Sequence, residues 1–525
     1  MKKALSAIIL TILTLTVTAQ ETEKWGRFET SFEASVKGNP FDVEMTATFT
    51  NGAESISVKG FYDGGGRFTV RFMPRCEGKW EFITHSKVRA LDGRRGSFLC
   101  TPPSEGNHGP VKAEGTSFKY ADGTWYHPVG TTSYSWMHAP EGYPARTLES
   151  LEESGFNKIR CLFFPQNISY EYEGPFPFER KADGSWDYTR FNPEYFRHVE
   201  DCADALLGLG VECDLILFHP YDGGRWGFDR MPLEVNLRYL GYIAARMGSF
   251  RNVWWSLANE WDGLRQIPRE DWDKFGECLA ESDPYGHLLS IHGYTATYYE
   301  YWKPWITHCS IQDQAPVEGP GRAGTVLNIY KKPVIFDEVC YEGNLTARWG
   351  RLSGEEELFR MWNALIAGTY CTHAECMNLD GDGRGEQSTN FLAFGGTFHG
   401  ESWKRIKFMR GILAQLPGPL YLADKSWDTS FAAAGDGYYL YYLGMEMTDE
   451  WAFDIPVKNQ GGARPAEGEK YVVDIIDTWD MTVTTWPETF ELGAPGPGNY
   501  RITDVQHRSV RLPLKPYILL RIRKI

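Results

Sequence analysis

Eight short apolar segments between residues 116 and 415 constrain the fold of this 525-residue chain more than any other feature. Each segment is long enough for one buried strand, and stretches of helical periodicity alternate with them. The segments cover residues 125–132, 157–165, 212–220, 253–260, 288–294, 308–314, 333–338 and 369–375. Eight such units in about 300 residues are typical of a closed barrel of parallel strands. We therefore predict an α/β fold, a (β/α)8 TIM barrel, over residues 116–415.

The segment 192–210 shows how clearly the helices of this region are marked. Asn192 can cap a helix and Pro193 suits its first turn, while Gly208 or Gly210 can end it. The apolar residues share one face at three- and four-residue spacing: Phe196, Val199, Ala203 and Leu206. This pattern predicts an amphipathic helix that packs one side against the barrel.

Both flanks of the predicted barrel have the pattern of β-structure. In residues 22–105, apolar and polar residues alternate and Gly and Asn-Gly turns separate the alternating runs. Alternating runs return in residues 418–525. Such short strands with frequent turns are typical of β-sandwiches. We predict an N-terminal and a C-terminal β-sandwich domain, the first joined to the barrel through a Pro- and Gly-rich linker.

Residues 1–19 have the features of a signal peptide. Lys2 and Lys3 precede an apolar run over 7–17, and the small residues Val17 and Ala19 are placed for cleavage before Gln20. The alternative is a membrane anchor, but the run is short for a span. We expect a secreted or periplasmic protein with no membrane span after cleavage.

The composition narrows the range of partners. A net charge of -15 would repel a phosphate backbone, so we expect no nucleic-acid partner. The 19 Trp residues could fill cores or stack on sugars, and the sequence leaves both uses open. The ten cysteines form no Cys-x-x-Cys pair, which favours buried free thiols. Pairing of Cys76 with Cys100 stays open, as does the oligomeric state.

Two of the predicted strands end in carboxylates. Asn259-Glu260 ends the fourth strand and Asp337-Glu338 ends the seventh. Catalytic groups of such barrels lie at the carboxyl ends of the strands. Hydrolysis of a glycosidic bond needs two carboxyl groups, separated by roughly 5–5.5 Å for retention and 6.5–9.5 Å for inversion. The sequence therefore points to Glu260 and Glu338 as a carboxyl pair across the barrel mouth.

This arrangement resembles clan A of the glycoside hydrolases, and more narrowly the apiosidase-like barrel glycosidases. The likeness lies in "WYHPVGTTSYSW", "DGSWDYTRFNPEYFRHVE" and "VWWSLANEWD". The resemblance implies a retaining mechanism in which Glu260 is the general acid/base and Glu338 the nucleophile. It also implies that Asn259 binds the sugar 2-hydroxyl and that Arg160 steadies the charge of the nucleophile.

Other polar and aromatic residues near strand ends are candidate substrate contacts. His292 or Tyr294 could donate to Glu338. The candidate set is Asn259, Arg160, His219, Asp222, His292, Tyr294, Gln312 and His373, with Trp136, Trp186, Trp226 and Trp261 as sugar platforms. Hydrogen bonding or packing inside the core is the alternative for each. Asp337 and Glu375 are the rivals of Glu338, and a strand-end glutamate can also cap a helix or pair with an arginine.

Two motifs resemble cofactor- or metal-binding patterns, but neither fits its pattern well enough to predict a bound group. "GPGRAG" at 319–324 matches a nucleotide-binding pattern, but we interpret it as a loop because it opens no recognisable helix. Residues 380–386 match only part of a calcium loop and suggest a loop over the cleft. We expect no cofactor and no metal. An inactive carbohydrate- or matrix-binding protein and a transglycosylase remain the alternatives, and the sequence names neither the sugar nor endo or exo action.

Overall fold

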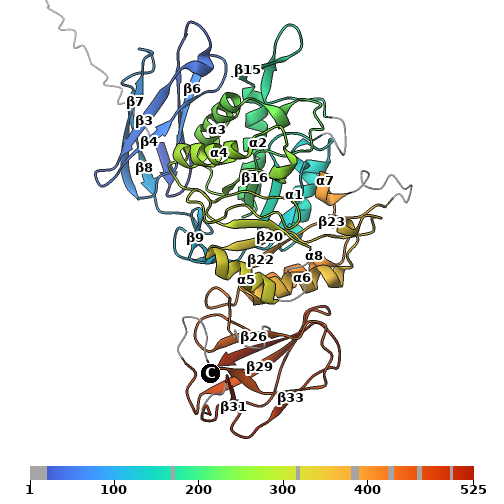
Figure 1. The fold of residues 1–525 in the computed structure, drawn as a ribbon. Coiled ribbons are helices and arrows are strands. Elements are labelled where there is room, and N and C mark those ends of the chain that lie inside the picture. Colours follow the sequence, from blue (N-terminus) through green and yellow to red (C-terminus); the bar gives the residue numbers. More distant parts are fainter. Residues whose placement is uncertain are drawn as a thin grey trace, which may run out of the picture.

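The computed structural model describes residues 20–166, 172–314, 320–379, 390–423, 431–457, 464–496 and 500–525. A β-sandwich, a barrel and a second β-sandwich follow one another along the chain (Figure 1). The expected signal peptide at 1–19 and the calcium-like segment at 380–386 lie outside the described residues. No helix within the described ranges has the length and apolar character that crossing a membrane requires.

All eight predicted barrel strands are present, and each pairs in parallel with its neighbours. They are β12 (Gly130–Thr132), β13 (Lys158–Leu162), β16 (Glu212–Ile216), β17 (Val253–Ser256), β18 (Leu289–Ser290), β19 (Cys309–Gln312), β20 (Val334–Glu338) and β22 (Tyr370–His373). The ladder runs from β18 through β12 to β19, and a hydrogen bond of 2.8 Å from Thr307 N to Leu289 O joins its two ends. The predicted TIM barrel is confirmed.

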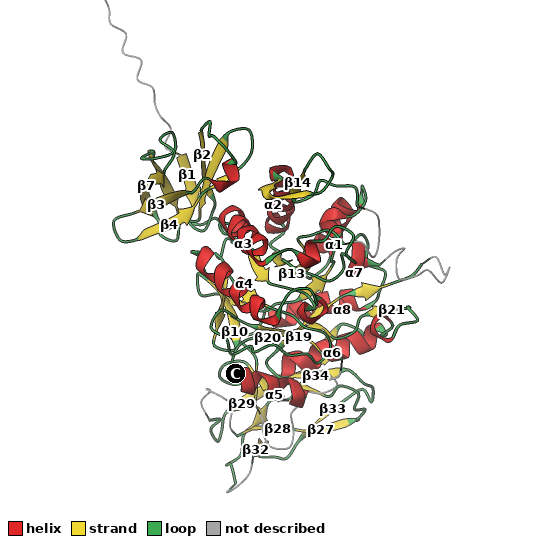
Figure 2. Ribbon diagram, turned by 45° about the horizontal axis from the view of Figure 1, so that its top comes forward, coloured by secondary structure: helices red, strands yellow, loops and turns green. Residues whose placement is uncertain are grey.

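Helices surround the barrel on its outside (Figure 2). They are α1 (Tyr143–Glu153), α2 (Pro193–Gly208), α3 (Leu233–Met247), α4 (Arg269–Ser282), α5 (Pro320–Tyr330), α6 (Gly354–Ile366), α7 (Phe391–Phe394) and α8 (Ser402–Leu413). Helix α2 begins as predicted, because the Asn192 side chain accepts from Glu194 N and Pro193 holds the first position. The four residues of its predicted apolar face are fully buried.

The interpretation of "GPGRAG" as a loop is wrong. Residues 320–324 form the first turns of α5, and Ala323 is fully buried there. The physical reason is that proline fits the first helical position, where its missing N–H would have no partner in any case. The helix was not recognisable from the sequence because its stability depends on packing, with Ala323, Val326 and Leu327 of α5 buried in the barrel core.

The N-terminal sandwich has two facing sheets, in the orders β1-β8-β7-β3-β4 and β2-β6-β5. Its strands are β1 (Gln20–Glu23), β2 (Phe28–Glu33), β3 (Met45–Thr50), β4 (Ser55–Lys59), β5 (Phe61–Tyr62), β6 (Arg67–Phe72), β7 (Gly78–Ser86) and β8 (Arg95–Thr101). Stacked phenylalanines fill the space between the sheets, with Phe49 and Phe72 at a centroid distance of 4.1 Å. The small sheet of β9 (Val111–Glu114), β10 (Ser117–Tyr120) and β11 (Trp125–Tyr126) leads into the barrel.

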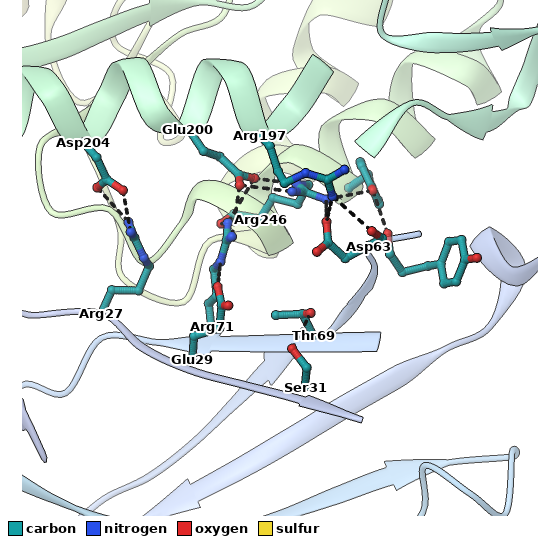
Figure 3. A network of polar contacts seen from close by, with 12 residues as sticks. Arg27, Glu29, Ser31, Asp63, Thr69, Arg71, Arg197, Glu200, Asp204 and Arg246 are labelled. Atoms are coloured by element: carbon teal, nitrogen blue, oxygen red, sulfur yellow. Dashed lines mark hydrogen bonds and ion pairs between the residues drawn. The ribbon is translucent and has the colours of Figure 1, made fainter. Parts of the chain in front are cut away.

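A buried network of charges joins this sandwich to helices α2 and α3 (Figure 3). The guanidinium group of Arg246, fully buried on α3, donates to Glu200 at 2.5 and 3.0 Å and to Asp63 at 2.9 Å. Arg71 of β6 also donates to Glu200, at 3.0 Å. Burial alone would raise the pKa of Glu200, but Arg246 and Arg71 outweigh it and hold the pKa below its usual value. The contact between the sandwich and the barrel therefore contains buried ion pairs in which each charge compensates the other.

The C-terminal sheet packs against the opposite side of the barrel, next to α6 (Figure 1). Its main sheet follows the order β24-β25-β26-β34-β29-β30, and β27-β33 and β28-β32 form two short ladders. The strands are β24 (Tyr421–Leu422), β25 (Phe431–Ala433), β26 (Tyr438–Tyr442), β27 (Glu450–Ala452), β28 (Asp454–Pro456), β29 (Lys470–Asp477), β30 (Thr482–Thr485), β31 (Phe490–Glu491), β32 (Arg501–Thr503), β33 (Ser509–Arg511) and β34 (Ile518–Lys524). Trp362 of α6 packs on Tyr442 of β26 at a centroid distance of 5.9 Å. The predicted pair of flanking sandwiches is confirmed.

The cysteines are all free, as the sequence favoured. The Cys76 thiol donates to Glu54, and the Cys100 thiol lies against the carbonyl of Thr101. Pairing of Cys76 with Cys100, which the sequence left open, is not formed in this structure.

Candidate active site

Glu260 and Glu338 both lie at the carboxyl ends of barrel strands, where the sequence placed them. Glu338 is the last residue of β20, and Glu260 follows β17 after an irregular stretch of three residues. Glu260 has φ 49° and ψ 52°, the left-handed conformation that residues other than glycine rarely adopt. Such strain costs about 1–3 kcal/mol and persists where the surroundings impose it. Both residues are nearly buried, with exposures of 7% and 6%.

A short chain of polar groups connects the two carboxyl groups. The Tyr134 hydroxyl donates to Glu338 Oε1 at 2.5 Å, and the Tyr221 hydroxyl donates to Glu260 Oε2 at 2.7 Å. Asn259 Nδ2 donates to both hydroxyls, at 3.3 Å to Tyr134 and 2.6 Å to Tyr221. The two carboxyl groups therefore belong to one site, and Asn259 lies between them.

Cationic and donor groups surround Glu338. Arg160 Nη1 and His292 Nε2 lie 3.5 Å and 3.3 Å from its Oε1. Burial raises the pKa of Glu338, but His292, Arg160 and the Tyr134 hydroxyl outweigh burial and hold it at about 2. This carboxylate is therefore ionised at neutral pH.

Glu260 has the opposite electrostatic environment. Burial and the negative charge of Glu338 raise the pKa of Glu260 to about 8, although hydrogen bonds from Tyr221 and Gln312 act the other way. No arginine or lysine is paired with its carboxyl group among the described residues. Glu260 is therefore mostly protonated at neutral pH, beside an ionised partner.

Beneath this pair, a charged network fills the barrel interior. Lys158 is fully buried and donates to Asp214 at 2.7 Å and to Asp337 at 3.0 Å. Ser310 and Thr372 donate to Asp337 as well, at 2.5 and 2.7 Å. Burial alone would raise the pKa of Asp337, but the positive charges of Lys158 and Arg160 outweigh burial and hold this pKa well below its usual value. Asp337 thus points into the closed interior, while Glu338 faces the barrel mouth.

The network also positions Arg160, which was predicted to steady the nucleophile. Its Nη2 donates to Asn259 Oδ1 at 2.6 Å, while its Nη1 faces Glu338. The Asn259 amide is thereby fixed with its oxygen toward Arg160 and its nitrogen toward the two tyrosine hydroxyls. Arg160 and Asn259 lie where the sequence placed them.

Three further predicted residues lie beside Glu260. The Tyr294 side chain is 43% exposed and its hydroxyl bonds Glu260, not Glu338 as was predicted. The Gln312 amide contacts the same carboxyl group. Trp261 follows Glu260 directly, and its ring packs edge-on against Tyr299 at a centroid distance of 5.3 Å. The Trp261 side chain is partly exposed.

Other predicted contacts do not reach the carboxyl pair. His219 bonds the carbonyl of Phe164 and the Tyr221 backbone, so it shapes the loop that carries Tyr221. His373 is fully buried behind the barrel wall, stacked on Phe156 at 4.9 Å. The remaining candidates are occupied by packing or backbone hydrogen bonds: Trp136, Trp186, Trp226, Asp222 and Glu375.

Sequence reasoning missed Tyr134 and Tyr221, which contact the two carboxyl groups. Each follows the end of a predicted strand, in "TTSY" and "FHPY". That position was a usable signal, because polar groups just beyond strand ends reach the barrel mouth.

The arrangement has the requirements for acid-assisted displacement at an acetal carbon. One carboxyl group keeps a proton near neutral pH and can deliver it to a leaving oxygen. The other is ionised and can attack or stabilise a cationic carbon. Two carboxyl groups whose environments push their pKa values apart are the mark of such an acid and base pair.

Comparisons with known proteins agree with this chemistry. The family described as "Apiosidase-like, catalytic domain" matches residues 111–374. Two families described as domains of unknown function, DUF5060 and DUF5605, match residues 21–87 and 427–523. No curated protein matches the chain.

Solved structures extend the comparison to the whole chain. A candidate glycoside hydrolase from Bacteroides vulgatus ATCC 8482 is 47% identical, with 96% of this chain and 100% of that chain covered and a TM-score of 0.92. A glycoside hydrolase family 5 protein from the same organism is 13% identical, with coverages of 79% and 93% and a TM-score of 0.57. The second likeness concerns the fold alone.

Proposed function

The chain belongs to the family of apiosidase-like catalytic domains and is a glycoside hydrolase, and we propose that it cleaves O-glycosidic bonds of plant or microbial glycans with retention of configuration. Glu338 is the nucleophile and Glu260 the general acid/base. The observation that carries this assignment is that the two carboxyl groups are joined through Asn259, with Arg160 and His292 beside Glu338 alone. This arrangement lowers the pKa of Glu338 and raises that of Glu260.

The reaction takes two displacements. In the first, Glu338 forms an ester bond with the anomeric carbon while the glycosidic bond breaks and Glu260 gives its proton to the leaving oxygen. In the second, the ionised Glu260 takes a proton from water, the water oxygen bonds to the anomeric carbon, and the ester bond to Glu338 breaks. The sugar leaves with its original configuration and both carboxyl groups regain their starting states.

The neighbouring residues have separate tasks in this scheme. Tyr134 and Arg160 stabilise the negative charge on Glu338 before attack and after release. Tyr221 and Gln312 orient the Glu260 carboxyl group. Asn259 lies between the two acids, where an amide can bind the 2-hydroxyl beside the cleaved bond.

The test is a screen of oligosaccharides and aryl glycosides with the wild type, Glu260→Gln and Glu338→Ala. We expect both variants to lose hydrolysis, and the first sugar released by the wild type to keep its anomeric configuration in early NMR spectra. Glu212→Gln is the matched control, because burial also raises the pKa of Glu212 to about 8. Glu212 lies at the start of β16, away from the carboxyl pair, and its carboxyl group accepts from the indole of Trp254.

Three outcomes would contradict the proposal. An inverted product would give Glu338 the role of a base that activates water. Full activity in Glu260→Gln would remove Glu260 as the acid. Binding of glycans without turnover of any substrate would favour a carbohydrate-binding protein.

The proposal includes export of the chain from the cytoplasm with loss of residues 1–19. It rests on the charged start, apolar run and small cleavage-site residues of the N-terminus. Protein recovered from outside the inner membrane should begin at Gln20 on N-terminal sequencing. A mature chain that begins at Met1 would contradict it.

A further inference from the structure

A second cluster of ionisable groups lies behind the barrel wall. The short strands β21 (Glu342–Gly343) and β23 (Glu375–Cys376) pair in parallel, with Glu342 opposite Glu375. His373 comes two residues before Glu375, so both side chains lie on the same side of the extended chain. A ring nitrogen of His373 and one carboxylate oxygen from each glutamate lie within 4.8 Å of one another. All three residues are buried, with exposures of 4% or less.

The carboxylates also cap a helix. Glu375 accepts from the backbone N–H groups of His399 and Gly400, at 2.6 and 2.8 Å. Glu342 accepts from those of Glu401 and Ser402 at the start of α8, at 2.7 and 2.9 Å. Anions at a helix N-terminus are stabilising, and this role alone accounts for two acidic residues here. It does not account for His373.

His373 is placed as a ligand and not as a cap. Its Nδ1 lies 3.1 Å from the Thr131 hydroxyl, whereas its Nε2 is buried with no hydrogen-bond partner among the described residues. A hydrogen bond from the other ring nitrogen is the usual support of a metal-binding histidine.

The cluster also lacks positive charge. No lysine or arginine forms an ion pair with Glu342 or Glu375 among the described residues, and the nearby Glu357 of α6 is fully buried with neither carboxyl oxygen hydrogen-bonded. Arg360 acts on Glu357 but is already paired with Glu356 at 2.7 Å. A bound cation would balance the negative charge of the buried carboxyl groups of Glu342 and Glu375.

We propose that Glu342, His373 and Glu375 bind a divalent first-row transition ion, with zinc as the ion to test first. One imidazole nitrogen and two carboxylate oxygens suit Zn²⁺ or Mn²⁺ better than Ca²⁺, which prefers oxygen ligands alone. The ion links the end of β22 and β23 to β21, and the two glutamates that bind it also accept hydrogen bonds from the chain at the start of α8. It holds the chain four residues beyond Glu338 and takes no part in the chemistry at the barrel mouth.

The experiment uses the full chain without a polyhistidine tag. After treatment with a chelator and dialysis, Zn²⁺ and Mn²⁺ are titrated by calorimetry, with Ca²⁺ for comparison, and zinc content is measured by mass spectrometry. We expect one zinc ion per chain and a melting temperature that rises with the logarithm of free zinc. His373→Gln should lose the ion, because it removes the nitrogen ligand and leaves the cap of α8 intact.

His308→Gln is the matched control. His308 is also fully buried, its Nδ1 lies 3.0 Å from the Thr307 hydroxyl and its Nε2 has no partner within the described ranges. It belongs to no group of three possible metal ligands among the described residues. The control should keep the zinc. Wild-type protein that binds neither zinc nor manganese, or a His373→Gln variant that binds zinc as tightly as wild type, would overturn the proposal.

A second measurement covers the case in which His373→Gln does not fold. Zinc-soaked crystals of the wild type, measured at the zinc absorption edge, should give an anomalous peak between the three side chains. If that position shows no peak, the carboxyl groups share protons and the proposal fails.

Discussion

Replacing Tyr221 with phenylalanine removes one hydroxyl and leaves the ring. In the structure that hydroxyl donates to Glu260 Oε2 at 2.7 Å and accepts from Asn259 Nδ2 at 2.6 Å. A donor to a carboxylate favours its ionised form, so the bond from Tyr221 lowers the pKa of Glu260. Its loss should therefore raise a pKa that is already about 8.

The size of the shift follows from the two charge states. A hydrogen bond is worth about 1.5–3 kcal/mol to a charged group and about 0.5–1.5 kcal/mol to a neutral one. The difference of about 1 kcal/mol corresponds to about 0.7 pH unit, since one pKa unit is about 1.4 kcal/mol. The pKa of Glu260 should rise by that amount. At pH 7, kcat/KM should fall about tenfold, because Asn259 loses an anchor and each 1.4 kcal/mol of barrier is tenfold in rate.

The assay is the pH profile of kcat/KM with an aryl glycoside substrate. The basic limb reports the general acid of the free enzyme, which must keep its proton, so activity should extend to higher pH in Tyr221→Phe. Tyr239→Phe is the control, because its hydroxyl is buried against the carbonyl of Leu217 away from the pair. A basic limb that stays in place or moves to lower pH would refute the contact between Tyr221 and the acid.

Three stability predictions can be checked by urea unfolding. Arg246→Met should cost about 3 kcal/mol at pH 7, because it removes the fully buried cation shared by Glu200 and Asp63 and leaves these carboxylates only their remaining arginine partners. The pKa of Glu200 in the folded protein lies below its ordinary 4.5, so the loss of unfolding free energy in this variant should be complete above pH 4.5 and shrink as the pH falls below that value. A loss that is unchanged at pH 3 would contradict the ion pair. Lys158→Met should also cost about 3–5 kcal/mol, because it leaves the buried Asp337 carboxylate without its 3.0 Å partner, and a loss under 1 kcal/mol would argue against that ion pair. Asn192→Ala should cost only about 1 kcal/mol, the value of one helix cap, so a larger loss would mean that the side chain does more than cap α2.

Strands and the carboxyl pair could be predicted because their signals are local. A buried strand needs a short apolar run, and a barrel carries its polar chemistry where such runs end. Glu260 and Glu338 were therefore visible as strand-end acids, and Arg160 as a basic residue in the second strand. The Pro-Gly start of α5 failed because its helical structure depends on packing against the barrel, which no local pattern records.

The sequence by itself determined the eight-strand barrel, its two flanking sandwiches and the positions of Glu260 and Glu338 at strand ends, because hydrophobic periodicity and the residues at strand ends can be read locally. Only the tertiary structure decided which similar residues share the site. His292 and His373 both stand near strand ends, yet one faces Glu338 and the other lies behind the wall. Neighbouring side chains of a strand point to opposite faces, so a shift of one residue moves a side chain from the inner side of the barrel to its outer face. Closure of the barrel then brought Tyr134 and Tyr221 to the acids from strands far apart in the chain.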